Sequence, residues 1–241
     1  MRISRIYTQA ILQISQLVAL EEKSSHHLSK VLRQKIGSSV ILFNGDGYDY
    51  SGQIDAIDKR SVSVKIASRE IVNNESPLKI HLGIAVSKGD RMDWIIQKST
   101  ELGVDEITPL LSARTEVKFK GDRKDKKQLH WQQIVISACE QSGRSRLPNI
   151  NPIQSLTEWT ETTKATKKFV LHHRTTQQLD SHDDVDLVCL LIGPEGGLSE
   201  DEIGFAEEHQ FSALQLGPRI LRTETAPLAA ISILQHTWGD M

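Results

Sequence analysis

Downstream of Leu78, short apolar stretches alternate with amphipathic ones, and this alternation restricts the fold more than any other feature of the sequence. The apolar stretches are KIHLGIAV, EITPLL, KFVLHH, DLVCLLI and SALQL. Segments whose apolar residues recur at helical spacing lie between and after them, at residues 90–103, 126–141, 199–209 and 225–238. Short strands interleaved with helices predict an α/β domain with a mostly parallel sheet.

The N-terminal part of the chain has a different pattern. Two turn motifs, Asn44–Gly47 and Asp58–Arg60, separate runs in which apolar and polar residues alternate. One helical stretch falls near Glu22–Gln34. The pattern predicts a small β-barrel-like or sandwich module over residues 1–73. The polar stretch Asn73–Pro77 then marks the boundary to a second domain, residues 74–241.

Length and composition are those of a globular protein large enough to be an enzyme. The chain has 241 residues, of which 38% are hydrophobic and 25% are charged. No apolar run approaches the ~20 residues that cross a bilayer, and no signal-peptide core is present, so we expect a cytoplasmic protein without a membrane segment. Cys139 and Cys189 form no CxxC motif, which predicts two reduced, buried thiols.

The charge is divided unevenly along the chain. Residues 1–150 contain 23 Lys and Arg against 17 Asp and Glu, whereas residues 151–241 contain 6 against 14. A basic N-terminal part is typical of a protein that faces an anion, and nucleic acid is the leading candidate. A mixed, solvated surface explains the same mild excess equally well.

Two loops are expected at the carboxyl ends of strands, where open α/β sheets bind ligands. The first, Gly193–Gly197, is a glycine-rich turn ahead of a helix that Ser199 would cap. It lacks the lysine of a P-loop and does not match GxGxxG, and Glu195 would place a carboxylate beside phosphate. A cationic or neutral ligand therefore fits better than a polyphosphate. A purely structural tight turn is the alternative.

The second loop, Leu216–Pro227, combines apolar residues with hydrogen-bonding groups at the start of the last helix. A purine-containing ligand requires such a combination. Helix capping alone also explains Glu224 and Thr225. An ordinary doubly wound enzyme that uses NAD or ATP is a rival interpretation, but the phosphate-binding motifs of that class are missing.

Both loops carry motifs of a known family. GPEGGLSEDE and LGPRILRTETAPLAA, at residues 193–202 and 216–230, resemble the C-terminal signature of the bacterial 16S ribosomal RNA (uracil-N3) methyltransferases, members of the SPOUT superfamily. MRISRIY, HHLSKVLR, KGDRMDWIIQKSTELGV and ACEQSGR resemble the same family in the same order. The resemblance therefore covers nearly the whole chain.

The resemblance implies a fold and a cofactor that composition does not reveal. It implies a PUA-like RNA-binding domain, then a SPOUT-type α/β domain with a deep trefoil knot, an active homodimer, and S-adenosyl-L-methionine bound by the knotted loops. The residues that it assigns to the cofactor site are Leu171, His172, Ile192, Gly193, Pro194, Glu195, Gly196, Gly197, Leu216, Gly217, Ile220, Leu221, Arg222, Thr223, Glu224, Thr225 and Ala226.

The reaction that the resemblance implies is methylation of N3 of a uridine in small-subunit ribosomal RNA, at uridine 1498 of the decoding region. Uridine N3 must lose its proton to become nucleophilic, and we assign to Arg222 the stabilisation of the developing uracil anion. Glu224 and Glu140 are candidate bases, although capping or ion pairing explains each of them equally well. A non-catalytic RNA-binding ribosome-assembly factor with the same fold is the alternative function.

Basic residues of both domains are expected to face RNA phosphates. They are Arg2, Arg5, Lys30, Arg33, Lys88, Arg91, Lys98, Arg144 and Arg146. For Arg91 and Lys98, ion pairing with Asp93 or Glu101 on the same helix is the alternative. The charged run Lys118–Lys127 predicts a solvated loop, with ordering on RNA as the alternative. No metal site is expected, because the pairs His26–His27 and His172–His173 lack partners at ligand spacing.

Overall fold

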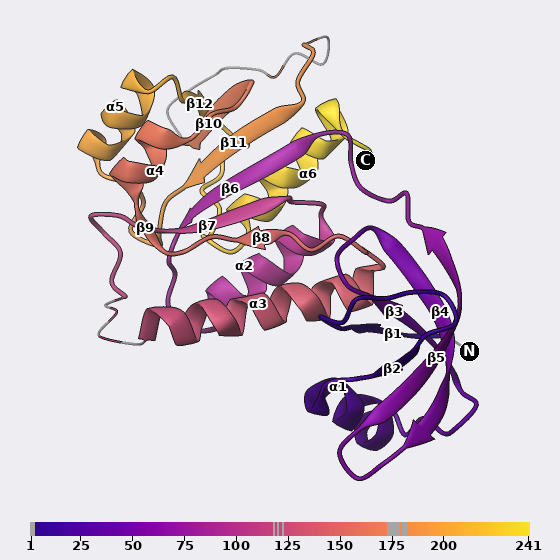
Figure 1. Ribbon diagram of the computed structural model, residues 1–241. Helices are drawn as coiled ribbons and strands as arrows, with labels where there is room; N and C mark the ends of the chain where they lie inside the picture. The colour runs from indigo at the N-terminus through magenta and orange to yellow at the C-terminus, as the bar shows by residue number, and fades with distance from the viewer. Residues whose placement is uncertain (1–2, 118, 120, 122, 173–178, 180–182) are drawn as a thin grey trace. The chain divides into compact units, whose positions relative to one another are not determined.

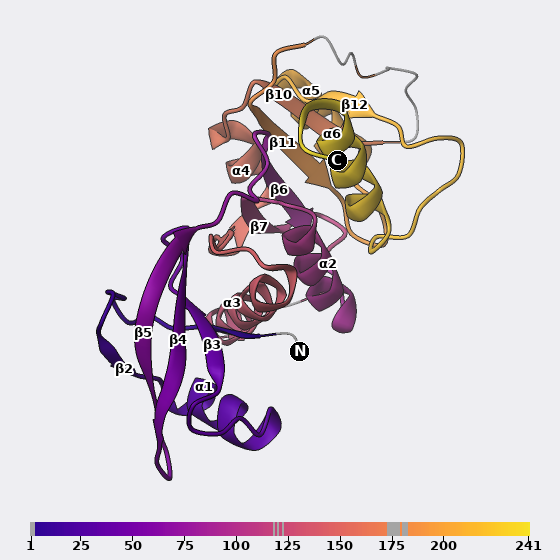
Figure 2. The same ribbon diagram turned by 90° about the vertical axis from the view of Figure 1, so that its right-hand side faces the viewer.

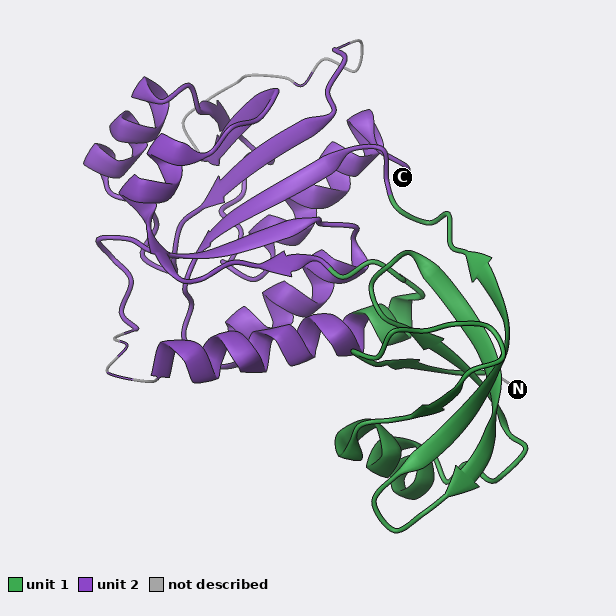
Figure 3. Ribbon diagram, in the orientation of Figure 1, with its two compact units in different colours: residues 1–75, 139–147 green, residues 76–138, 148–241 purple. Residues whose placement is uncertain are grey.

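The computed structural model describes residues 3–117, 119, 121, 123–172, 179 and 183–241. Contacts between residues divide the chain into two compact units (Figure 3). Unit 1 comprises residues 1–75 and 139–147, and unit 2 comprises residues 76–138 and 148–241. Unit 1 therefore includes a short segment from the middle of the chain that the sequence alone assigns to the second domain.

Unit 1 is built on a five-stranded sheet with the order β1-β3-β4-β5-β2 (Figure 1). Its elements are β1 (Ser4–Tyr7), β2 (Leu17–Ala19), α1 (Glu22–His26), the π-helix η1 (His27–Val31), β3 (Ser39–Phe43), β4 (Tyr48–Ile57) and β5 (Val62–Ile71). Both expected turns occur. Gly45 and Gly47 adopt φ angles of +94° and +91° between β3 and β4, a conformation that favours glycine. The Asp58 N–H donates to the Ser61 carbonyl at 2.8 Å and closes the β4–β5 hairpin.

Buried polar contacts hold residues 139–147 in unit 1. Arg144 is only 5% exposed, and its guanidinium donates to both carboxylate oxygens of Glu75, at 3.1 and 2.5 Å. Arg5 pairs with Asp49 and donates to Ser145 Oγ at 3.0 Å. Because a buried charge requires a partner, these contacts secure the segment in the unit.

Unit 2 contains a parallel sheet with the order β12-β10-β11-β6-β7-β8, and β9 also pairs with β7. Its elements are β6 (Lys79–Ala85), α2 (Asp90–Glu101), β7 (Glu106–Leu111), α3 (Arg123–Ser142), β8 (Asn149–Ile150), β9 (Gln154–Ser155), α4 (Leu156–Thr162), β10 (Lys167–Leu171), β11 (Leu187–Ile192), α5 (Glu200–Glu208), β12 (Ser212–Leu214) and α6 (Ala226–Trp238). All the pairings described in this sheet are parallel, which confirms the α/β prediction.

Helices cover both faces of the unit 2 sheet. In Figure 2, α2 and α6 lie on one face and α4 and α5 on the other. Strands β6 and β11 are consequently buried along most of their length, which explains their continuous apolar sequences. Gly83 in β6 allows α4 to approach the sheet, because a Cβ at this position would lie 2.5 Å from the ring of Trp159.

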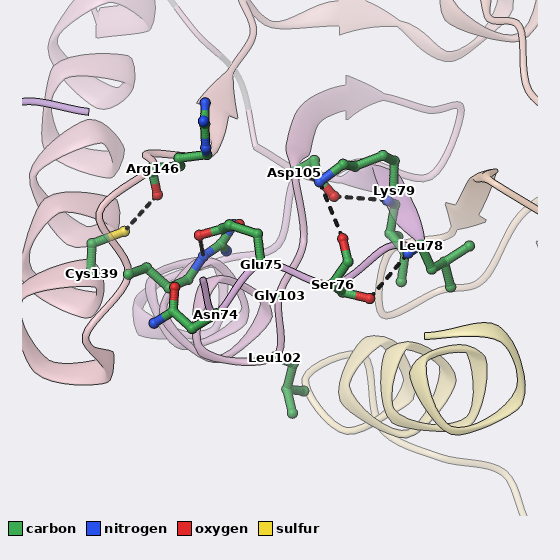
Figure 4. Close-up of polar contacts among 12 residues, drawn as sticks. Asn74, Glu75, Ser76, Leu78, Lys79, Leu102, Gly103, Asp105, Cys139 and Arg146 are labelled. Carbon is green, nitrogen blue, oxygen red and sulfur yellow. Dashed lines mark hydrogen bonds and ion pairs between the residues drawn. The ribbon is translucent and has the colours of Figure 1, made fainter. Parts of the chain in front are cut away.

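Local signals set the ends of several elements in unit 2. At the start of α5, Ser199 Oγ accepts the N–H of Glu202 at 3.2 Å, and the Glu202 carboxylate accepts the N–H of Ser199 at 2.8 Å, which confirms the expected cap. Gly103 follows α2 with a φ of +86°, a conformation that favours glycine and ends the helix. Ahead of β6, the Leu78 N–H donates to Ser76 Oγ at 3.1 Å, and Lys79 Nζ pairs with Asp105 at 3.0 Å (Figure 4).

The cysteines are buried and free, as the sequence predicts. Cys139 Sγ donates to the carbonyl of Arg146 at 3.7 Å inside unit 1 (Figure 4). Among the helices of the described ranges, none has the length and apolar character needed to span a membrane.

Candidate active site

The loops after three neighbouring strands meet at one edge of the unit 2 sheet. Strand β10 lies between β12 and β11, and all three are parallel, so their carboxyl ends share that edge. A cavity of about 540 Å³ lies there. The expected cofactor residues that line it are Leu171, His172, Ile192, Gly193, Pro194, Glu195, Gly196, Gly197, Leu216, Gly217, Ile220, Leu221, Thr223 and Ala226.

Backbone geometry explains the glycines of the first loop. A Cβ at Gly193 would lie 2.9 Å from the backbone nitrogen of Leu198, closer than real Cβ contacts. Gly197 has a φ of +67° and donates its N–H to the carbonyl of Pro194 at 2.9 Å, which closes the turn. Arg114, in the loop after β7, donates to the carbonyls of Gly196 and Leu198 at 2.8 and 3.2 Å. The loop is therefore tight, and a second loop holds it in place.

The loop between β12 and α6 contributes apolar surface to the cavity. Gly217 adopts a φ of +94°, which favours glycine. Ile220 is 89% exposed although its side chain is apolar, and it lines the cavity. Ile220 therefore adds apolar surface to the cavity, as the lining of small-molecule sites usually does.

Three of the expected cofactor residues, Arg222, Glu224 and Thr225, are not among the described residues that line the cavity. Arg222 is exposed, and its carbonyl accepts the N–H groups of Thr225 and Ala226, both at 2.9 Å. Thr225 is the N-cap residue of α6, but its side chain makes no capping hydrogen bond. Thr225 therefore occupies the capping position of α6, but its side chain does not cap the helix.

Arg91, in the first turn of α2, links the two loops electrostatically. Its Nη1 donates to Glu195 Oε1 at 2.8 Å, and its Nε lies 3.8 Å from Glu224 Oε2. The N–H of Lys88 donates to the same Glu195 oxygen at 3.2 Å. Burial acts to raise the pKa of Glu195, but hydrogen bonds from its own backbone, Arg91 and Lys88 outweigh burial and lower the pKa. Glu195 is therefore ionised, with Arg91 as its counter-ion.

Comparison with known proteins assigns this chain to a family. The family model for the RNA methyltransferase domain matches residues 74–235, and the one for the RNA methyltransferase PUA domain matches residues 20–67. The ribosomal RNA small subunit methyltransferase E of Buchnera aphidicola subsp. Schizaphis graminum is 40% identical over 242 residues, covering 100% of this chain and 98% of that protein. The chain belongs to the ribosomal RNA small subunit methyltransferase E family.

Other proteins, two of them named methyltransferase E, are also similar along most of the chain. The Bacillus subtilis protein of this name is 32% identical, covering 88% of this chain and 86% of its own. A methyltransferase of Legionella pneumophila, solved with bound cofactor SAM, is 42% identical with a TM-score of 0.97 and full coverage of both chains. The methyltransferase E of Neisseria gonorrhoeae, solved with S-adenosyl methionine, is 39% identical with a TM-score of 0.93 and full coverage of both chains. The resemblance seen in the motifs is thereby confirmed.

The structure adds lining residues that the motifs of the methyltransferase E family did not single out. These are Arg114, Leu198, Glu200, Ile203, Leu214, Gln215 and Arg219. Arg114 follows the end of β7 by three positions. Because ligands bind at the carboxyl ends of parallel strands, this position was a signal that could have predicted Arg114. Arg219 lies inside the second motif, where the resemblance assigned its neighbours and not Arg219 itself.

In unit 1, the residues expected to face RNA phosphates divide into exposed and buried ones. Lys30, Arg33 and Arg146 are exposed. Arg144 is instead buried in its pair with Glu75, and Arg5 is partly buried beside Asp49, so both guanidinium groups already have a carboxylate partner. Arg2 lies outside the described residues.

In unit 2, the expected RNA-facing residues all have acidic partners. Lys88 pairs with Glu116, and Arg91 pairs with Glu195 and not along its own helix. Lys98 pairs with Glu101 at 2.8 Å, as the alternative interpretation predicted. The charged run beyond Lys118 is not all loop, because α3 begins at Arg123. Lys118 itself lies outside the described residues.

Among the described residues, His172 lines the cavity, whereas Glu140, His26 and His27 do not. Glu140 belongs to unit 1, where its carboxylate accepts the N–H of Tyr7 at 3.0 Å. Burial raises the pKa of this carboxyl. Within the part of the chain that the structure describes, no three His, Cys, Asp or Glu side chains converge as metal ligands would, and His173 lies outside that part.

Proposed function

We propose that this chain transfers the methyl group of S-adenosyl-L-methionine to N3 of a uridine in 16S ribosomal RNA, the decoding-region uridine 1498. One observation carries the proposal: the two motif loops converge on a single cavity in a member of the methyltransferase E family. The names of the relatives specify small-subunit ribosomal RNA, and two similar solved structures hold S-adenosyl methionine.

The residues of the cavity fit this cofactor. Its volume of about 540 Å³ is in the range of small-molecule sites. Apolar side chains such as Ile192, Leu216 and Ile220 suit the purine, and charged side chains of both signs, Glu195 and Arg219 among them, suit the ammonium and carboxylate of the amino-acid part. When bound, S-adenosyl-L-methionine supplies an electrophilic methyl group attached to a positively charged sulfur.

Two residues of the loop before α6 are assigned to the uracil ring. Glu224 would accept the N3 proton, which leaves a negative charge delocalised over the two uracil oxygens and N3. The Arg222 guanidinium would stabilise this charge by donating hydrogen bonds to an oxygen. The exposure of Arg222 supports this role, because an RNA nucleotide has access to its side chain.

The remaining parts of the proposal concern the assembly. We propose that residues 1–73 bind RNA and residues 74–241 carry out methyl transfer, that the motif loops are part of a deep trefoil knot, and that the active form is a cytoplasmic homodimer. Family membership supports each of these statements. The exposed Lys30 and Arg33 support the RNA-binding role of residues 1–73.

The test is methylation of small ribosomal subunits from cells that lack this modification. The protein is incubated with these subunits and methyl-labelled S-adenosyl-L-methionine, the RNA is digested, and the labelled nucleoside is identified by mass spectrometry. We expect 3-methyluridine. Label in another nucleoside would refute the proposed target atom. Binding of S-adenosyl-L-methionine by calorimetry without any label in the RNA would favour the non-catalytic assembly factor.

A further inference from the structure

Unit 2 has a second hollow, of about 410 Å³, that the proposed reaction does not use. Its lining is Val117, Phe119, Arg123, Lys126, Lys127 and His130. Among these described residues there is no acidic side chain, and the apolar part is contributed by Val117 and Phe119. The hollow therefore combines a cationic wall with an aromatic ring.

The cationic wall is one face of a helix. Arg123, Lys126, Lys127 and His130 occupy positions i, i+3, i+4 and i+7 of α3, so they lie on the same side. Arg123 repels Lys126 and Lys127 at this spacing, and Arg123 and Lys126 also stand at the helix N-terminus, where the macrodipole favours anions. Asp125 in the same turn offsets part of this repulsion. The concentration of Arg123, Lys126 and Lys127 on one side of the helix therefore suits an anionic ligand.

Contacts with α2 hold this face in place. His130 Nε2 lies 2.6 Å from Asp93 Oδ2, and the indole N–H of Trp131 donates to Asp93 Oδ1 at 3.2 Å. Trp131 is only 1% exposed and anchors the helix in the core. Arg123 and Lys126 are exposed and extend from this anchored helix. A ligand would therefore meet cations on a rigid support.

We propose that this hollow binds a single-stranded segment of the substrate RNA next to the target uridine, with phosphates at Arg123 and Lys126 and a base against Phe119. Cations that follow a backbone, together with an aromatic ring on which a base stacks, are the usual means of binding single strands. The inference rests on the proposed function for its RNA.

The chain connects the hollow to the cofactor cavity. Arg114 lines the cavity and Phe119 lines the hollow, and both belong to the connection between β7 and α3. Five residues span at most about 18 Å, so the backbones of Arg114 and Phe119 lie within that distance of each other. An RNA segment in the hollow is therefore close enough to include neighbours of the reacting nucleotide.

The first test measures RNA affinity as a function of salt for the double variant Arg123→Gln/Lys126→Gln. Lys124→Gln is the matched control, because Lys124 is exposed in the same helical turn and does not line the hollow. The probe is a 16S ribosomal RNA fragment containing the decoding region. We expect the slope of log K against log salt to become less negative by about 0.7 for each single-strand phosphate that the variant no longer binds. The control should have the slope of the wild type. The affinity for S-adenosyl-L-methionine should be unchanged.

The second test separates stacking from charge. Phe119→Ala should weaken RNA binding without changing the salt slope, and Phe119→Trp should restore binding. Unchanged RNA affinity in the double variant, or an equal weakening in Lys124→Gln, would overturn the inference. Competition by poly-glutamate as effective as that by RNA would assign the hollow to an acidic protein and would also overturn it. Failure of the wild type to methylate any subunit, with RNA binding still weakened in the double variant, would refute the proposed function and leave the RNA site standing.

Discussion

Substitution of Arg222 is expected to reduce catalysis without reducing the stability of the fold. Its side chain is exposed, and surface substitutions rarely unfold a protein. Arg222→Ala should lower kcat by about 10²- to 10³-fold, the usual effect of removing one donor to a developing anion, with the Tm within a few degrees of the wild type. Single-turnover methylation with saturating S-adenosyl-L-methionine, combined with a thermal melt, measures both. Near-normal turnover of the variant would exclude Arg222 from the mechanism.

Arg91 is expected to align the two loops of the cofactor site through its contacts with Glu195 and Glu224. Because its side chain is 46% exposed, its pair with Glu195 is screened by water and contributes little. Arg91→Gln should therefore weaken the affinity for S-adenosyl-L-methionine by only about two- to five-fold. Lys98→Gln is the matched control, since Lys98 lies on the same helix and pairs with Glu101 within that helix. Calorimetry that finds the same affinity in both variants would show that Arg91 does not align the loops.

At the scale of elements, a partly buried polar network joins β6, β7 and α4. The indole N–H of Trp159 can only donate, and it donates to His81 Nε2 at 3.1 Å. His81 Nδ1 therefore carries the proton, and it lies 3.5 Å from a Glu106 carboxylate oxygen. Burial lowers the pKa of His81 despite the opposing effect of Glu106. Protonation of Nε2 would also break the bond from Trp159, so the folded state favours the neutral ring.

This network predicts that the protein becomes less stable as the pH falls below about 6.5, the pKa of histidine in an unfolded chain. Below that value the unfolded state binds a proton that the folded state does not bind at His81, so the free energy of unfolding decreases as the pH falls. The decrease is at most about 1.4 kcal/mol per pH unit. His81→Gln should remove this part of the slope in urea titrations between pH 5 and 7. An identical pH dependence in the variant would contradict the assignment.

How far the sequence predicts these elements depends on their length. Strands β6 and β11 and helices α2 and α5 have clear periodicity or caps, and all were predicted. Helix α4 has only 7 residues, too few for a period, and it was missed. A signal was present, because Ser155 and Glu158 have capping-box spacing, and Ser155 Oγ accepts the N–H of Glu158 at 3.1 Å.

For the site, the sequence also predicts what local motifs determine, and it does not predict contacts between residues far apart in the chain. The motif loops were predicted to share one edge of the sheet, and their residues line one cavity. Arg5 and Arg144 were instead expected to face RNA, because their partners are remote in sequence: Asp49 is 44 residues from Arg5, and Glu75 is 69 residues from Arg144. Such pairs follow from packing, which no local pattern encodes.

At the scale of the whole molecule, each unit contains one buried thiol. Cys139 belongs to unit 1, and Cys189 belongs to unit 2, in the strand that leads into the glycine loop of the cavity. Burial raises the pKa of Cys139 to about 12 and also raises the pKa of Cys189. Since the thiolate is the reactive form, each cysteine should be alkylated only when its own unit opens. The two thiols are therefore separate probes of the two units.

The last prediction is that S-adenosyl-L-methionine protects Cys189 from alkylation more than it protects Cys139. The cavity residues all lie in unit 2, so the cofactor stabilises the closed form of that unit, by about 2.7 kcal/mol at a concentration of 100 times Kd. Labelling of Cys189 should then slow by about 100-fold in moderate urea, and labelling of Cys139 by much less. The single-thiol variants Cys139→Ala and Cys189→Ala allow each rate to be followed by mass spectrometry. Because helix α3 runs from unit 2 into unit 1, equal slowing of both thiols is the outcome that would contradict separate opening and make the chain one cooperative body.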